Sequence, residues 1–250
     1  MRLNRNGVKY LAMAAMVCDH AALFLFAEWT DVYHVLRSIG RISYPLFLAL
    51  FVEGFFFIKE ERYLTHLRDL CLVALLSEPV FNQMLSGQWF TLEFQNVMFS
   101  WLLLFLLFVG FTYTLKLLRI TNRMSTWDRT IELLFLFSCG MTLGWLFRVD
   151  YSWYGILGGG LAYFYFAYGR STHRKGCAWF AALPLCLLLS LLSGYWTTML
   201  AVPILLWYDS EQSCCRSKYL KYGMYLFYPA HLWLLYLVHT VWYPVRLLAG

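Results

Sequence analysis

Long apolar stretches follow one another along almost the whole chain of 250 residues. A stretch of about 17–25 mainly apolar residues is long enough to cross the hydrocarbon core of a bilayer as one helix. Hydrophobic residues make up 61% of the chain and charged residues only 14%, which is more apolar surface than one soluble core could bury. The composition excludes a soluble enzyme, a disordered chain and a coiled coil, and it indicates an all-α, polytopic transmembrane helix bundle.

Nine apolar stretches are candidate membrane spans, and we expect between eight and ten. The eighth is short, and only Ser193 and Gly194 separate it from the seventh, so these two could instead form one re-entrant hairpin. Asp19 and His20 interrupt the first stretch, and because a polar pair is foreign to a signal peptide we expect this stretch to be retained. The nine spans cover approximately residues 9–27, 42–58, 66–84, 96–117, 131–147, 151–169, 177–193, 195–208 and 222–241.

Lysine and arginine are distributed unevenly between the two sides of these spans. With the N-terminus in the cytoplasm, the inner segments hold 16 of the 20 basic residues and the outer segments hold four. This asymmetry predicts a multi-pass protein of the cell (inner or cytoplasmic) membrane with a cytoplasmic N-terminus. It also accounts for the net charge of +6, so the expected partner is the lipid bilayer and not nucleic acid. Without a linker or an internal repeat, we expect one domain over residues 1–250.

Five ionisable side chains interrupt the apolar spans, and each is a candidate for function because it is costly at membrane depth. They are Asp19, His20, Glu53, Glu78 and His231. His20, Glu78 and His231 lie 11, 10 and 10 residues beyond a basic residue at the cytoplasmic end of their span. At 1.5 Å per residue, all three lie about 15–17 Å above that end, near the middle of the bilayer. The three basic residues are Lys9, Arg68 and Lys221.

Lys9 and His20 lie on one face of the first predicted helix, because eleven residues are close to three helical turns. A cation at the cytoplasmic end and an imidazole near the middle suit an anionic carrier with a long thin arm, such as an acyl-coenzyme A. The alternative is that Lys9 only anchors the helix end and that His20 is a structural hydrogen-bonding residue. The seven cysteines include no CxxC pair and no metal-ligand spacing, so we expect no metal.

Asp19 projects about 100° away from His20 on a regular helix. A carboxylate buried without a partner is costly, so we expect it to pair with Arg37, with Arg41 or with an imidazole of another helix such as His231. Arg37 and Arg41 are four residues apart and share a helix face if the second helix starts early. They could bind an acidic group of a substrate or a helix carbonyl.

Several short motifs occur in a fixed order along most of the chain. They are Met16-Val17-Cys18-Asp19-His20, Gly40-Arg41-Ile42-Ser43-Tyr44-Pro45-Leu46-Phe47, Glu53-Gly54, Ser77-Glu78-Pro79-Val80-Phe81, Asp150-Tyr151 with Tyr154-Gly155, and Phe227-Tyr228-Pro229-Ala230-His231-Leu232. In this order they resemble the TraX family, membrane proteins associated with acetylation of conjugative pilin. Tyr44 stands where a phenylalanine is common in that family.

The resemblance implies an integral membrane acetyltransferase that passes an acetyl group from acetyl-CoA, its co-substrate, to an amine such as the N-terminus of a pilin. It extends to the wider transmembrane acyltransferases, in which a basic residue recurs at a distance from a histidine along the first helix, as Lys9 does from His20. Lys9, Arg68 and Lys221 are then the candidate coenzyme-binding residues.

Transfer to an amine needs a base for the proton of the nucleophile and a donor for the developing oxyanion. We expect His20 to be the general base and His231 to be a second proton carrier or the oxyanion donor. The remaining candidate catalytic residues are four charged groups in or next to these spans: Asp19, Arg41, Glu53 and Glu78. We expect Asp19, Arg41 and Glu53 to form a supporting polar network.

Other functions would use the same residues. An O-acyltransferase would acylate a glycan or a small hydroxyl compound, so the acceptor is either a peptide or protein, or a glycan. A proton-coupled transporter would use the buried histidines and carboxylates as a relay, although the chain lacks the paired half-chain symmetry of many transporters. A non-enzymatic assembly protein is the remaining alternative.

Overall fold

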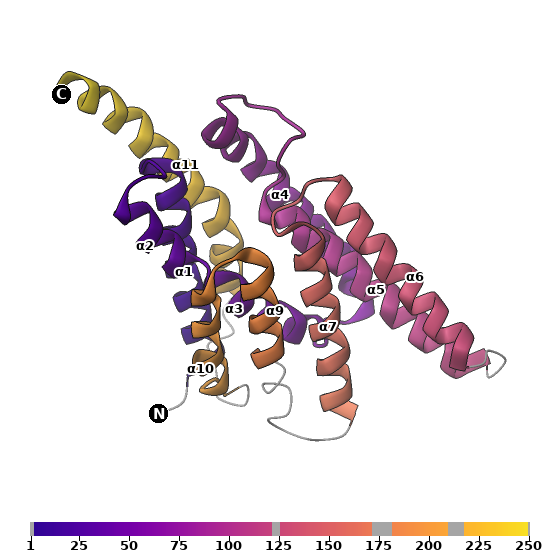
Figure 1. Ribbon diagram of the computed structural model, residues 1–250. Coiled ribbons are helices and arrows are strands. Elements are labelled where there is room, and N and C mark those ends of the chain that lie inside the picture. Colours follow the sequence, from indigo (N-terminus) through magenta and orange to yellow (C-terminus); the bar gives the residue numbers. More distant parts are fainter. Residues whose placement is uncertain (1–2, 122–125, 172–181, 210–217, 250) are drawn as a thin grey trace. The chain divides into compact units, whose positions relative to one another are not determined.

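The fold is described by a computed structural model that covers residues 3–121, 126–171, 182–209 and 218–249. Over these residues the chain is helical, and the only bridges between extended residues are two isolated ones, Leu3 with Tyr208 and Gln95 with Val149. The helices are coloured along the sequence in Figure 1. The predicted all-α fold is therefore confirmed.

The chain forms two compact units, and each combines segments that are distant in sequence. The first unit comprises Met1–Leu50, Leu75–Thr91 and Trp179–Gly250, and the second comprises Phe51–Ala74 and Leu92–Ala178. Helices α3 (Ser43–Phe55) and α4 (Tyr63–Ser86) contribute residues to both. The single domain expected over residues 1–250 stays a prediction.

The first unit contains α1, α2 and the C-terminal helices, and α1 packs against α2 and α11. Asn4 begins α1 by accepting a hydrogen bond from the backbone N–H of Gly7 through its side chain, and Thr30 caps α2 in the same way. The bounds are α1 (Arg5–Leu25), α2 (Asp31–Gly40), α9 (Ala182–Ser193), the 3₁₀ helix η2 (Trp196–Leu200), α10 (Ala201–Leu206) and α11 (Lys218–Ala249).

Small and branched side chains let α1, α3, α9 and α10 pack closely in this unit. Buried Val8 and Ala12 of α1 belong to one apolar cluster with Leu46 of α3 and Cys186 of α9. Leu205 of α10 is also fully buried there. This cluster includes the N-terminal half of α1, so the polar residues further along α1 extend from a closely packed segment.

The second unit is built from α5 (Val97–Thr121), α6 (Thr126–Leu146) and α7 (Ser152–Ser171), with η1 (Glu60–Arg62) and the first part of α4. Gly159 and Gly160 of α7 face Leu104 of α5 and Phe137 of α6 so closely that a Cβ atom at either glycine would overlap them. The glycine run is a helix-packing feature, because it lets α7 approach both neighbours.

The loop before α7 holds Asp150-Tyr151, one of the motifs of the sequence. Arg148, Tyr151 and Ser152 adopt positive φ angles of 49°, 62° and 42°, a region that non-glycine residues rarely occupy. Backbone hydrogen bonds between Gln95 and this loop, 3.0 and 3.2 Å long, compensate part of the strain. The motif therefore shapes the entry to α7 in the second unit.

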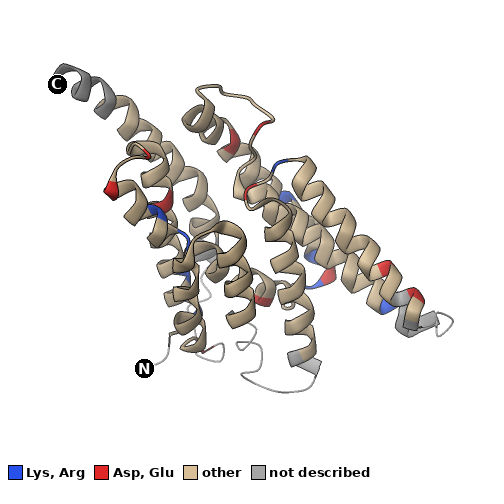
Figure 2. Cartoon of the chain, viewed as in Figure 1, with Lys and Arg blue, Asp and Glu red and all other residues tan. Residues whose placement is uncertain are grey.

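Three helical segments of the described chain are long and apolar enough to cross a membrane. They are Arg5–Leu25, Asp31–Phe55 and Val97–Lys116, which correspond to the first, second and fourth predicted spans. Charged residues are sparse along most helices (Figure 2). The chain is thus a helical membrane protein, but nine spans are not confirmed.

Two predicted spans have different bounds in the structure. The second begins at Asp31 and not at residue 42, because α2 precedes α3 with only Arg41 and Ile42 between them. The eighth is the short segment Trp196–Leu206, half of it 3₁₀ helix, which is too short to cross a bilayer on its own. The seventh prediction, residues 177–193, lies partly outside the described residues.

Replacing Gly160 by alanine tests the close packing of α7. Because the new Cβ would overlap the ring of Phe137, we expect Gly160→Ala to lower the free energy of unfolding by about 1–3 kcal/mol. Gly223→Ala on α11 is the matched control, since nothing lies within 4 Å of its added Cβ. Thermal unfolding of both variants in detergent measures the difference, and equal melting temperatures would contradict the packing role.

Candidate active site

Two histidines from opposite ends of the chain meet in the first unit. Nδ1 of His20 on α1 lies 2.7 Å from Nε2 of His231 on α11, and each residue is only 6% exposed. Their rings stack with centroids 5.0 Å apart and an interplanar angle of 17°. The structure thus brings together two of the three residues for which the sequence predicts a common depth.

The partner of His231 determines which nitrogen of each ring holds a proton. Nδ1 of His231 lies 2.8 Å from the carbonyl oxygen of Phe227, one turn earlier on α11. A carbonyl only accepts, so in the neutral pair Nδ1 of His231 donates and its Nε2 accepts. Nδ1 of His20 must then donate to His231, which leaves the lone pair on Nε2 of His20. The arrangement makes Nε2 of His20 the basic nitrogen of the pair.

Aromatic rings enclose the histidine pair. Phe24 stacks on His20 with centroids 5.7 Å apart, and Phe227 stacks on His231 at 5.0 Å. The buried ring of Tyr228 meets both imidazoles edge-on, at 5.9 and 5.4 Å. These contacts hold the ring planes and limit access of water. Sequence reasoning did not assign Phe24 or Tyr228 to the site, although Phe227 and Tyr228 stand in the motif that contains His231.

Asp19, the neighbour of His20 in sequence, pairs with arginines that follow or end α2. Its Oδ2 atom lies 2.7 Å from Nη1 of Arg37, and its Oδ1 atom lies 3.6 Å from Nε of Arg41. The three side chains are only 10–14% exposed. Of the partners considered for Asp19, the structure therefore selects the two arginines. Both sit at the C-terminal end of α2, where the helix dipole favours positive charge.

Gly40 explains how α2 comes so close to Asp19. A Cβ atom at this position would overlap the Cα, Cβ and Oδ1 atoms of Asp19, and a backbone atom cannot move aside as a flexible side chain can. Glycine therefore sets the separation of α1 and α2 at the ion pair. The Gly40-Arg41 motif supplies both this close approach and one of the two cations.

Aromatic rings also flank the arginines. The Cζ atom of Arg41 lies 5.0 Å from the ring centroid of Tyr195, and that of Arg37 lies 6.0 Å from the ring of Tyr33. Such cation–π contacts stabilise guanidinium groups in places with little water. Tyr33 and Tyr195 carried no signal in the sequence that distinguished them from interfacial aromatic residues.

The other two predicted catalytic residues, Glu78 and Glu53, belong to different units. Glu78 lies on the part of α4 that belongs to the first unit and is partly buried. Glu53 is 2% exposed but belongs to the second unit. Of the network expected around His20, the structure places Arg41 beside Asp19, and the role of Glu53 stays a prediction.

The three predicted coenzyme-binding residues lie on three different helices. Lys9 lies on α1, which is an unbroken α-helix, so its spacing of eleven residues keeps it on the face of His20. Arg68 belongs to the second unit, where its side chain is 67% exposed and lies 2.9 Å from Asp69. Lys221 lies on α11, with its side chain outside the described residues.

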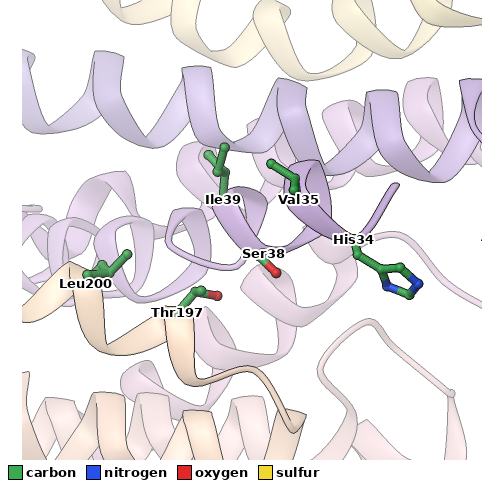
Figure 3. Close-up of a pocket in the computed structure, with 6 residues that line it drawn as sticks. All are labelled: His34, Val35, Ser38, Ile39, Thr197 and Leu200. Carbon is green, nitrogen blue, oxygen red and sulfur yellow. The ribbon is translucent and has the colours of Figure 1, made fainter. Parts of the chain in front are cut away.

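A groove of about 290 Å³ lies between α2 and η2 (Figure 3). Its lining is mainly apolar, and Ser38 and Thr197 project into the space between the two segments. Neither His20 nor His231 lines it. The full lining is His34, Val35, Ser38, Ile39, Thr197 and Leu200. Over the residues that the structure covers, no group of three or more metal-ligating side chains is placed to hold a metal ion.

Neutralising Asp19 and Arg37 one at a time tests how much their ion pair contributes to the free energy of unfolding. We expect Asp19→Asn to lower the free energy of unfolding by about 3–5 kcal/mol, because it leaves the buried guanidinium groups without their carboxylate. Arg37→Gln should cost less, because Arg41 remains beside Asp19. Chemical denaturation of both single variants and of the double variant measures the coupling.

Arg68→Gln is the control for this pair, since its ion pair with Asp69 is exposed and should contribute less than about 1 kcal/mol. Additive effects of Asp19→Asn and Arg37→Gln would mean that the two side chains are not energetically coupled.

Comparisons with known proteins bear on this site. Residues 4–239 match the family model described as TraX protein. Among curated proteins, the probable fimbrial assembly protein FimC, serogroup H1, of Dichelobacter nodosus is 30% identical over 79 residues. This similarity covers 32% of the chain and 32% of that protein. No solved structure matches.

Proposed function

The chain belongs to the TraX family, and we propose that it is an integral membrane acetyltransferase that moves an acetyl group from cytoplasmic acetyl-CoA to an acceptor amine. The observation that carries the proposal is the buried hydrogen bond between His20 and His231. A relative that matches part of the chain is named a probable fimbrial assembly protein. That name supports an acceptor among exported proteins, such as the N-terminus of a pilin subunit.

His20 is the general base of the proposed reaction. Nε2 of His20 takes the proton from the attacking nitrogen, while its Nδ1–H stays bonded to Nε2 of His231. The positive charge that develops on His20 is stabilised by this acceptor, and Phe227 holds the acceptor in turn through Nδ1 of His231. A base oriented by a third group is the arrangement that activates nucleophiles in many acyl transfer enzymes.

His231 acts as a positioning residue in this proposal. In the neutral pair its single N–H donates to the carbonyl of Phe227, and its other nitrogen accepts from His20. It therefore has no N–H to offer an oxyanion. Of the two roles that the sequence suggests for His231, its hydrogen bonds support the proton-accepting role and not that of oxyanion donor.

Lys9 is the proposed contact for the phosphates of acetyl-CoA. It lies about 16 Å from His20 along one face of α1, at 1.5 Å per residue. The apolar cluster around Val8 and Ala12 keeps this part of α1 rigid. The coenzyme would stay on the cytoplasmic side of the cell membrane and extend its thioester to His20. An acceptor from the opposite side would meet the acetyl group there, so the coenzyme need not cross the bilayer.

The same pair could take a proton from a hydroxyl group, so an O-acyltransferase acting on a glycan or a small hydroxyl compound is the second candidate. The observation that favours it is the lone pair that the two hydrogen bonds leave on Nε2 of His20, because such a nitrogen can accept a proton from a hydroxyl as well as from an amine. Mass spectrometry of candidate acceptors incubated with acetyl-CoA separates the two, because it locates the added acetyl group on an amine or on a hydroxyl.

His20→Ala tests the base directly. We expect the rate of acetyl transfer by the purified protein to fall by about 10²–10⁴-fold, because the variant has no group to accept the proton. His231→Gln should retain more activity, since its amide oxygen can still accept from Nδ1 of His20. His34→Ala is the matched control, because His34 is exposed on α2. Full activity of His20→Ala would overturn the assignment.

Binding of acetyl-CoA can be tested without an acceptor. At 100 times its Kd, a ligand that binds only the folded protein stabilises it by about 2.7 kcal/mol, so acetyl-CoA should raise the melting temperature. Lys9→Gln should weaken this shift, and His20→Ala should leave it. A proton-coupled transporter for another solute would show no shift with acetyl-CoA.

A further inference from the structure

The Nε donor of the Arg37 guanidinium is not used by any described residue of the protein. Nη1 donates to Oδ2 of Asp19 at 2.7 Å. Nε is buried and has no acceptor among the described residues. Nε and Nη2 lie on the same side of the planar group and point their N–H bonds in parallel. These two parallel N–H donors can both donate hydrogen bonds to one anionic oxygen group.

We propose that Arg37 supplies the oxyanion donors of the acetyl transfer, with Nε–H and Nη2–H directed at the carbonyl oxygen of the thioester. The inference rests on the function proposed above and adds a catalytic residue to it. It fills the role that His231 leaves open, because both nitrogens of His231 are engaged with His20 and Phe227.

The position of Arg37 beside His20 follows from Asp19. Asp19 and His20 are consecutive on α1, and the ion pair holds Arg37 against that turn of the helix. The imidazole of His20 and the guanidinium of Arg37 are thus held at the same turn of α1, because Asp19 and His20 are adjacent.

An unfilled buried donor suits this role better than a satisfied one. A buried N–H without an acceptor carries a free-energy cost in the resting protein. That cost is relieved only when negative charge appears in front of it, so the interaction is stronger in the transition state than in the ground state. Interactions with this property raise kcat. The side chain of Arg37 is only 14% exposed, so little water competes for the oxyanion.

The reaction balances with these groups. The lone pair of the acceptor nitrogen forms a bond to the thioester carbon, and the carbonyl π electrons move to the oxygen that Nε–H and Nη2–H of Arg37 hold. Nε2 of His20 takes the proton from the nitrogen. The oxyanion then re-forms the C=O bond and breaks the C–S bond, and the departing thiolate takes the proton back from His20. The products are the acetylated amine and free coenzyme A.

Asp19 and Gly40 are positioning residues in this account. Asp19 orients the guanidinium through Nη1, which leaves the other edge directed away from the ion pair. Gly40 permits the close approach of α2 that brings Arg37 to Asp19. Arg41, also beside Asp19, adds a second positive charge next to the carboxylate.

Arg37→Lys is the test, measured by steady-state acetyl transfer with the purified full-length protein in detergent. Lysine keeps the positive charge and a partner for Asp19 but loses the parallel N–H pair. We expect kcat to fall by about 10²–10³-fold, as it does when an oxyanion donor is removed. KM for acetyl-CoA and the melting-temperature shift with acetyl-CoA should stay close to wild type. Arg62→Lys, at an exposed position of η1, is the control for the same exchange.

Chemical rescue gives a second readout that a structural role would not move. We expect added ethylguanidine to restore part of the activity of Arg37→Ala, and ethylamine to restore less, because only the first supplies the paired N–H groups. If Arg37→Ala does not fold, the kcat of Arg37→Lys alone decides.

The outcomes separate this inference from the proposed function. An Arg37→Lys protein whose kcat stays within about threefold of wild type, while His20→Ala is inactive, overturns the role of Arg37 alone. So does a loss confined to KM, which would mean that Arg37 binds a ground-state anion of a substrate. A wild-type protein that binds acetyl-CoA but transfers no acetyl group to any acceptor overturns both.

Discussion

Polar groups inside a membrane protein must satisfy one another, because the hydrocarbon core offers no water to replace a missing partner. The ion pair of Asp19 with Arg37 and the hydrogen bond of His20 with His231 are two places where this constraint shapes the first unit. Each joins α1 to a different helix. If either contact were absent, a buried polar group would stand uncompensated, so these contacts tie the packing of α2 and α11 to α1.

Two consecutive residues of α1 produce this arrangement. Side chains of neighbouring residues on a helix point about 100° apart, so Asp19 and His20 cannot meet the same helix. Asp19 faces α2 and selects its arginines, whereas His20 faces α11 and selects His231. The Asp-His pair is therefore a junction of three helices, and the chemistry proposed for His20 depends on the same geometry that holds the unit together.

Some parts of this site could be predicted from the sequence, and others could not. Residue spacing predicted a common depth for His20 and His231, and the cost of burying charge named the two arginines among the candidate partners of Asp19. The carbonyl of Phe227 and the ring of Tyr195 could not be predicted as parts of the site. Every residue has a carbonyl, and this chain has 18 tyrosines that the sequence does not distinguish. The count of nine spans is not confirmed for a related reason. Hydropathy measures the length of an apolar stretch, and it does not tell a crossing helix from the short segment Trp196–Leu206.

The sequence by itself determined that this is a helical membrane protein and which few polar residues interrupt its apolar segments. Those properties depend on composition and on a rise of 1.5 Å per residue, which are local. Only the tertiary structure decided which faces meet. That Nδ1 of His20 donates and leaves a lone pair on Nε2, and that Nε of Arg37 has no acceptor among the described residues, depend on the approach of α2 and α11 to α1. Gly40 and the surrounding aromatic rings set that approach through close packing, which no spacing along one chain segment encodes.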